Sequence, residues 1–153
     1  MKEIKNFISS KESDELIEFH KKNFNLNTEG CLMHRNTEVI SWTLLTKFKN
    51  LEKALTKFAK NVNNNYVINS FEIVKWPTGE SQPNHLDFNF HPYTSIIYLN
   101  DNYEGGETVV ENKTIVPEKN KLVSFEGDKM IHKVNEIIKG TRYTVPCWYR
   151  YES

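Results

Sequence analysis

Apolar residues recur at helical spacing in two segments of the first 65 residues. In the clearer segment they recur at steps of three and four, which predicts a helix with one buried stripe formed by Leu44, Phe48, Leu51, Leu55, Phe58 and Val62. An earlier helix is predicted over residues 9–24, with Ser9 as N-cap and Glu12 as its capping-box partner. Its partial apolar face consists of Leu16, Ile17 and Phe24. The segment 25–42 between them has no clear period and is interpreted as loop and short strand.

From Tyr66 onward the pattern changes to short apolar runs separated by turn residues. The runs are "YVINSFEIVKW", "SIIYLND", "ETVVEN", "KLVSFEG", "MIHKVNEII" and "TRYTVPCWYR". Short strands in this number, with no helix between them, favour an antiparallel sandwich or jelly roll with the helices packed on one sheet. We predict a mainly β fold with N-terminal helices. One domain would span residues 1–153, with 1–65 as helical support and 66–150 as the β core.

Composition narrows the function classes. The 20 basic and 20 acidic residues cancel, so no overall field favours nucleic acid as a partner. The sequence contains neither a secretory signal nor a run of about 20 apolar residues, so we expect a soluble, cytoplasmic protein without a membrane partner. Cys31 and Cys147 lie far apart and are as consistent with two free thiols as with a disulfide. The oligomeric state is not predicted.

Two ionisable side chains, His85 and Asp87, are two positions apart in "QPNHLDFNF", a segment with strand character. On a strand such residues point to the same side and can share one ligand. A third candidate, His132, follows in "MIHKVNEI", again with strand character. Two imidazoles and one carboxylate leave positions of an ion open, as in the non-haem Fe(II) oxygenases. For the His-x-Asp motif alone, a solvated surface pair is the alternative.

Arg142 lies ten residues after His132, beyond the reversal "NEIIKG". If a hairpin joins the two strands in suitable register, Arg142 lies opposite His132 on the same face. Its guanidinium would then point into the metal pocket, where it would suit a carboxylate bidentately. A strand arginine that faces water is the alternative.

Six motifs follow one another between residues 66 and 150, in the order "HLD", "SIIYLND", "YEGGETVV", "VPEKNKLVSF", "MIHKV" and "IIKGTRYTVPCW". Their order resembles that of the 2-oxoglutarate and Fe(II)-dependent oxygenases of the prolyl 4-hydroxylase type. The resemblance implies a double-stranded β-helix, which is a cupin-like jelly roll. It also implies that His85, Asp87 and His132 are iron ligands and that Arg142 holds the distal carboxylate of 2-oxoglutarate.

The resemblance extends to the neighbouring strand. Tyr98 matches a tyrosine whose hydroxyl helps to hold that carboxylate, and Thr94, on the same face, would add a hydrogen bond. Gly105 and Gly106 match a glycine pair that we interpret as structural. The implied cofactors are Fe(II), 2-oxoglutarate and O2, with ascorbate as an optional reductant.

Two positions depart from the family pattern. Trp76 stands where family members commonly have a tyrosine, so the contact of that hydroxyl near the cosubstrate is lost or replaced. Asn120 stands where a glycine is usual, and asparagine also enters the left-handed region of backbone space.

The implied activity is hydroxylation of a substrate, with prolyl residues of a peptide or protein favoured, coupled to decarboxylation of 2-oxoglutarate to succinate and CO2. The alternatives are an oxygenase of a free amino acid or other small molecule, a cupin-type metal-dependent hydrolase or isomerase, and a binding module without turnover. Arg142 and Tyr98 favour the oxygenase, since a hydrolase needs no second carboxylate site. Catalysis would need no side chain beyond the metal ligands.

Fold does not choose the substrate. The candidates for substrate contact are Trp76, Asn89 and Tyr93, together with the segment 27–42. Among the remaining histidines, His91 is the one placed to line the mouth of the site.

Overall fold

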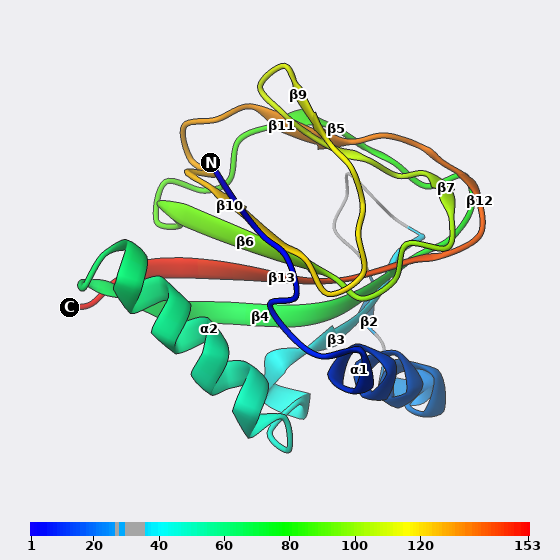
Figure 1. Cartoon of the computed structure of the whole chain (residues 1–153), viewed down its shortest axis with the longest axis horizontal. Helices are drawn as coiled ribbons and strands as arrows, with labels where there is room; N and C mark the ends of the chain where they lie inside the picture. Colours follow the sequence, from blue (N-terminus) through cyan, green and yellow to red (C-terminus); the bar gives the residue numbers. More distant parts are fainter. Residues whose placement is uncertain (27, 30–35) are drawn as a thin grey trace.

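The protein is built on two antiparallel β-sheets with two helices on one outer face (Figure 1). The computed structural model describes residues 1–26, 28–29 and 36–153. The larger sheet contains, in spatial order, β1 (Lys2–Ile4), β10 (Leu122–Phe125), β6 (Tyr93–Tyr98), β13 (Arg142–Tyr151), β4 (Tyr66–Trp76), β3 (Glu38–Ser41) and β2 (Thr28–Glu29). The smaller sheet contains β5 (Gln82–His85), β11 (His132–Val134), β8 (Thr108–Val110) and β9 (Lys113–Ile115). A short pair joins β12 (Ile137–Lys139) to β7 (Glu104–Gly105).

The helices α1 (Ser10–Lys22) and α2 (Lys49–Val62) cover the face of the larger sheet that points away from the smaller one (Figure 1). The predicted stripe of α2 is confirmed at Leu51, Leu55 and Phe58, which are buried in the main core. The helix nevertheless begins only at Lys49, and Leu44 precedes it in the 3-10 turn η2 (Trp42–Leu44), where its side chain is exposed. No described helix is long and apolar enough to cross a membrane.

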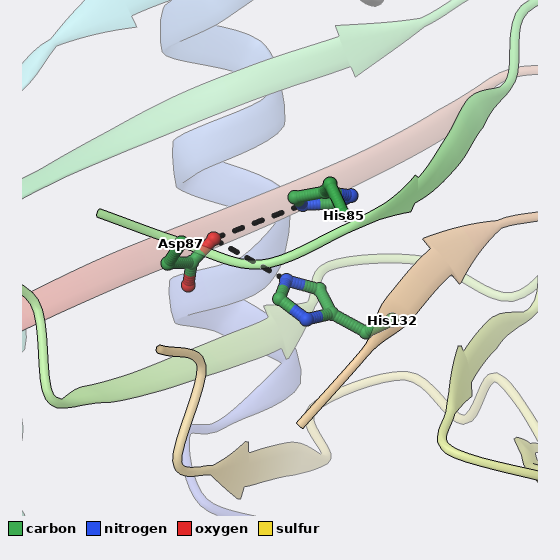
Figure 2. A group of neighbouring side chains, drawn as sticks. All are labelled: His85, Asp87 and His132. Carbon is green, nitrogen blue, oxygen red and sulfur yellow. Dashed lines mark ion pairs between the residues drawn. The ribbon is translucent and has the colours of Figure 1, made fainter. Parts of the chain in front are cut away.

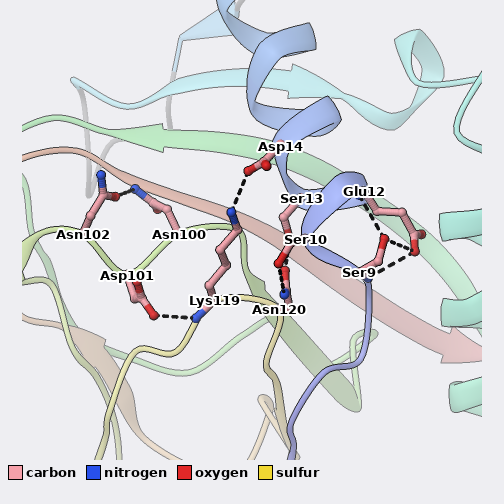
Figure 3. A network of polar contacts seen from close by, with 10 residues as sticks. All are labelled: Ser9, Ser10, Glu12, Ser13, Asp14, Asn100, Asp101, Asn102, Lys119 and Asn120. Atoms are coloured by element: carbon pink, nitrogen blue, oxygen red, sulfur yellow. Dashed lines mark hydrogen bonds and ion pairs between the residues drawn. The ribbon is translucent and has the colours of Figure 1, made fainter.

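The start of α1 confirms the predicted capping box, because the side chain of Ser9 accepts from the backbone of Glu12 and the Glu12 carboxylate accepts from the backbone of Ser9 (Figure 3). Phe24 does not belong to the apolar face as predicted. It lies beyond the helix in the 3-10 turn η1 (Phe24–Leu26) and is 72% exposed.

Asn120 connects α1 to the sheet. Its φ of 75° confirms the expected left-handed backbone. Its side chain accepts a hydrogen bond from Ser13 and donates one to Ser10, both on α1 (Figure 3). An asparagine at this position therefore does what a glycine cannot, since it ties the first helix to the loop before β10.

The side chains of β6 alternate between the two faces of the larger sheet. Tyr93 and Ile97 point into the helix-side core, whereas Thr94, Ile96 and Tyr98 point toward the smaller sheet. Tyr93 packs against Tyr66 and shares a hydrogen bond with Ser124. Our assignment of Tyr93 to substrate contact was therefore wrong, because the alternation of the strand turns this side chain away from the site.

The hairpin suggested for His132 and Arg142 does not form. Strand β11 pairs with β5 and β8 in the smaller sheet, whereas β13 pairs with β4 and β6 in the larger one. Arg142 is paired with Trp76, not with His132. The two sheets face each other, so Arg142 reaches the space between them from the other wall.

Candidate active site

Three side chains point toward one another between the sheets: His85, Asp87 and His132 (Figure 2). One potential ligand atom from each lies within 4.8 Å of those of the others. Oδ1 of Asp87 is 3.7 Å from Nε2 of His85 and 3.3 Å from Nε2 of His132. His85 pairs directly with His132 across β5 and β11, so sheet register brings the imidazoles together. Asp87 lies beyond the end of β5, so the predicted single strand carrying both residues is corrected to a strand end followed by a loop.

The histidine rings are oriented by the backbone. Nδ1 of His85 lies 2.9 Å from the carbonyl of Pro83, and Nδ1 of His132 lies 2.8 Å from the carbonyl of Met130. A carbonyl can only accept, so each Nδ1 carries the proton and each Nε2 presents a lone pair to the centre of the trio. Burial, together with the nearby His132, lowers the pKa of His85, which favours the neutral imidazole that a metal requires.

Asp87 is held through both its side chain and its backbone. The hydroxyl of Thr94 donates to Oδ2 at 2.6 Å, and the backbone N–H of Asp87 donates to the carbonyl of Gly127 at 2.9 Å. Burial raises the pKa of Asp87, but the neighbouring His132 and the hydrogen bond from Thr94 lower it by more, so the pKa lies below its usual value. Thr94 was expected to bind the cosubstrate. The structure instead assigns its hydroxyl to the orientation of a metal ligand.

Gly127 is a site residue that the sequence did not reveal, because in "FEGDK" it reads as an ordinary turn glycine. A Cβ on Gly127 would collide with Oδ2 of Asp87 and with Oγ1 of Thr94. The backbone there does not adopt a positive φ, so the obstacle to alanine is the contact with Asp87 and Thr94 and not the local conformation.

Replacing Gly127 with alanine should therefore weaken metal binding by about 10- to 100-fold, the range found when the partner that orients a ligand is lost. Titration with Co(II), followed by its absorbance, would measure this. The matched control is Gly79→Ala, at a position with open space around it but a φ of 91°, which tests backbone strain alone. Equal metal affinity of Gly127→Ala and wild type would contradict the expected displacement of Asp87 from the metal.

A second polar cluster lies around Arg142, whose side chain is among the largest fully buried ones. Nη2 of Arg142 donates to Oγ1 of Thr108 at 3.0 Å, and the hydroxyl of Tyr98 donates to the same oxygen at 2.7 Å. Thr108 then accepts twice, so its own proton is free to be donated to a ligand. The expected proximity of Tyr98 and Arg142 is confirmed, and Thr108 is a further residue that the sequence did not reveal.

The cluster around Arg142 fits an anionic ligand. No carboxylate in the described part of the chain forms an ion pair with the guanidinium, and Nε of Arg142 and the hydroxyl of Tyr103 are buried without hydrogen-bond partners. A buried charge without a counterion is costly, and a bidentate carboxylate would relieve that cost. The residues therefore fit the distal carboxylate of 2-oxoglutarate.

Trp76 lies against the guanidinium. The Cζ atom of Arg142 is 4.9 Å from the centroid of the Trp76 ring, which is a cation–π distance. The indole thus occupies the place of the usual tyrosine with a stacking contact. Trp76 lines the cavity at the Arg142 end, so its expected role in substrate contact stays a prediction, as does that of exposed Asn89.

One cavity of about 530 Å³ connects the two polar clusters. Its lining includes the metal trio, Thr108 and Arg142. The expected place of His91 on its wall is confirmed, and Trp148, Pro146 and Glu72 line it as well. The segment 27–42 is described only in part: Val39 on β3 lines the cavity, while residues 30–35, which include Cys31, lie outside the described ranges. Cys147 is a free, buried thiol whose pKa is raised by burial, consistent with a core role.

Glu72 is the residue of this wall with the clearest titration anomaly, since burial raises its pKa to about 7 from 4.5. Both folded and unfolded chains are protonated below pH 4.5, so no cost exists there. The cost grows as the pH rises to 7 and is complete above it. A tenfold change in the ionisation constant is worth about 1.4 kcal/mol, so the upper limit is about 3 kcal/mol.

Glu72→Gln should therefore stabilise the metal-free protein by about 1–3 kcal/mol at pH 8 and have little effect at pH 4.5. Urea unfolding across this pH range would measure the difference. Glu136→Gln, at an exposed position, is the control that should show no such trend. A stabilisation independent of pH would contradict a buried, ionising Glu72.

Comparison with known proteins agrees with this geometry. The sequence model of the 2OG-Fe(II) oxygenase superfamily matches residues 71–150. Human prolyl 3-hydroxylase 2 is 33% identical over 70 residues, which are 40% of this chain. The match spans only 10% of the length of that human protein.

Solved structures match over nearly the whole chain. The viral collagen prolyl hydroxylase of Paramecium bursaria Chlorella virus-1 has a TM-score of 0.74 at 20% identity, covering 98% of this chain and 95% of the viral one. A prolyl-4-hydroxylase of Pseudomonas putida has a TM-score of 0.78 at 14% identity, covering 99% and 92%. A prolyl hydroxylase of Trichoplax adhaerens, solved with a hypoxia inducible factor peptide fragment, has a TM-score of 0.76 at 20% identity, covering 98% and 83%. These likenesses confirm the predicted jelly-roll fold.

Proposed function

Because the chain belongs to the 2OG-Fe(II) oxygenase superfamily, we propose that it is a 2-oxoglutarate-dependent Fe(II) dioxygenase that hydroxylates prolyl residues of a peptide or protein. The observation that supports this most directly is one cavity with the metal trio in one part and the buried, unpaired guanidinium of Arg142 in another. Bound Fe(II) and 2-oxoglutarate would supply the oxidising chemistry, in which O2 provides the hydroxyl oxygen and 2-oxoglutarate leaves as succinate and CO2.

The residues of the chain bind and orient. Nε2 of His85, Nε2 of His132 and Oδ1 of Asp87 converge from one side, which leaves the other positions of a metal open to the cavity. Arg142 and Thr108 present donors to the distal carboxylate of the cosubstrate, and the hydroxyl of Tyr98 orients Thr108 by donating to it. Apolar walls such as Val74, Ile96 and Val134 exclude water from the space between the clusters.

A peptide substrate is supported by the loop after β5. Leu86, Phe88 and Phe90 are exposed by 50%, 69% and 58%, and the rings of Phe88 and Phe90 stack at 5.2 Å. Leu86 and Phe88 also line the cavity, so the apolar surface continues from the interior to the outside. Such a surface at the mouth suits an extended chain better than a small polar molecule.

A small-molecule substrate is the second candidate. The α-ketoglutarate-dependent epimerase SnoN, from nogalamycin biosynthesis, has a TM-score of 0.77 at 11% identity. The same fold thus serves other chemistry, and the choice depends on the pocket. A cupin-type hydrolase is disfavoured, since it would give no use to the buried Arg142.

To test the function, the protein is loaded with Fe(II) under anaerobic conditions and mixed with 2-oxoglutarate and a library of proline-containing peptides. The mixture is then exposed to air. We expect succinate and, in the same tube, a peptide heavier by one oxygen atom, with ascorbate sustaining turnover. In the matched control, the proline of the responding peptide is replaced by 4-hydroxyproline. Succinate formation without any oxidised peptide would favour the small-molecule alternative, and the absence of succinate with every substrate would refute the dioxygenase proposal.

A further inference from the structure

An acidic side chain shares the cavity with the metal trio but has no place in the chemistry described so far. Glu72 lies on β4, where Ser70, Glu72, Val74 and Trp76 all line the cavity. We infer that Glu72 is a specificity-determining residue that binds a cationic group of the substrate, an inference that rests on the proposed hydroxylase function.

The protein supplies no counterion to this carboxylate within the described residues. The register of β4 on β13, set by Thr144 with Val74 and Cys147 with Phe71, places Pro146 opposite Glu72. On the other side of β4, Ser41 of β3 pairs with Glu72, so neither cross-strand neighbour carries a charge. Burial is the sole cause of the raised pKa of Glu72, with no hydrogen bond or charge opposing it. The carboxylate is therefore a half-buried acid on the cavity wall that no basic group among the described residues neutralises, as a binding group for a cation would be.

The other charged groups of the cavity are already committed. Arg142 is paired with Trp76, four residues along β4 from Glu72, which is about 13 Å of strand. Its guanidinium bonds to Thr108 and stacks on Trp76. His85 and His132 belong to the metal trio, and Nε2 of His91 bonds to the side chain of Asn69, so none of these imidazoles serves as a counterion for Glu72. A cation for Glu72 must then come with the substrate.

An ammonium or guanidinium group is the partner that fits. It would make a charge-assisted hydrogen bond in a largely dry site and would hold Glu72 ionised. Two sources have this chemistry: a lysyl or arginyl side chain beside the hydroxylated residue, or the free amino group of a small substrate. The apolar aromatic loop at the mouth favours the side chain of a peptide.

The test is a binding titration that needs no turnover. Blocked peptides with one proline, flanked on either side by lysine or by glutamine, are titrated into the protein loaded with Mn(II) and 2-oxoglutarate, and binding is followed by calorimetry. Nα-acetyl-lysine amide and its Nε-acetylated form, which differ only in the side-chain amine, are a second pair that tests a free amine outside a peptide. We expect a lysine peptide to bind roughly 10- to 100-fold more tightly than its glutamine twin.

Glu72→Gln, which keeps the shape and removes the charge, should abolish that preference. Glu72→Asp should retain part of it, and Ser70→Ala, which removes a neighbouring polar group of the same wall, should retain it fully. Equal binding of every lysine and glutamine pair to the wild type, or a preference that survives Glu72→Gln, would overturn the inference. Hydroxylation of the same peptides is scored separately by mass, so prolyl hydroxylation can fail or stand independently of the charge preference.

Discussion

Replacing His132 with alanine is expected to abolish high-affinity metal binding and, with it, all 2-oxoglutarate turnover. His132 supplies one of the three converging ligand atoms, and its Nε2 lies 3.3 Å from Oδ1 of Asp87. With two ligands left, we expect the affinity for Fe(II) or Co(II) to fall by more than about 100-fold, beyond what the loss of an orienting partner costs. Co(II) titration followed by absorbance would measure it, with anaerobic Fe(II) calorimetry as a check.

The matched control is His91→Ala. His91 lines the same cavity and its Nε2 bonds to the side chain of Asn69, but it is not one of the three converging groups. Metal binding by this variant should remain close to that of the wild type. His132 also packs edge-on against Phe125, with ring centroids 4.7 Å apart, so thermal unfolding of each metal-free variant must be recorded. A folded His132→Ala protein with unchanged metal affinity would place the metal site elsewhere.

Much of the fold could be predicted because residues close together in the sequence determine many of its elements. The capping box at Ser9 and the apolar stripe of α2 are both local patterns, and the structure confirms them. The strand ranges from Tyr66 onward follow from turn residues between apolar runs. The edge strand β1 could not be foreseen, since its three residues are exposed and owe their conformation to pairing with β10, more than 100 positions away.

The candidate site was predictable where chemistry demands a residue type and not where only contact matters. His85, Asp87, His132 and Arg142 carry groups that are costly to bury without a purpose. Gly127 and Thr108 are unremarkable in sequence and acquire their roles from contacts with Asp87 and Arg142 that only the folded chain creates. The alternation of side chains along β4 could have placed Glu72 in the cavity, because Glu72 is an acid on the same face of the strand as Trp76.

Replacing Arg142 with methionine should raise the dissociation constant of 2-oxoglutarate by about 100-fold or more while leaving metal binding intact. Removing one member of a buried, hydrogen-bonded charge pair costs about 2–5 kcal/mol of binding. The trio does not include Arg142, so Co(II) affinity in the absence of 2-oxoglutarate should be unchanged. Calorimetric titration of 2-oxoglutarate into the Mn(II)-loaded protein would measure the loss, and Arg150→Met, at an exposed position on the same strand, is the control.

The same substitution has a second, opposite consequence. Without its ligand the protein holds a buried guanidinium that lacks a carboxylate partner among the described residues, and its Nε has no acceptor. Methionine of similar length removes that unpaired charge, so the ligand-free variant should be at least as stable as the wild type in urea unfolding. The wild type alone should gain stability when 2-oxoglutarate is added. Loss of stability in the ligand-free variant would mean that Thr108 and Trp76 already compensate the charge, and unchanged 2-oxoglutarate affinity would mean that the cosubstrate binds away from Arg142.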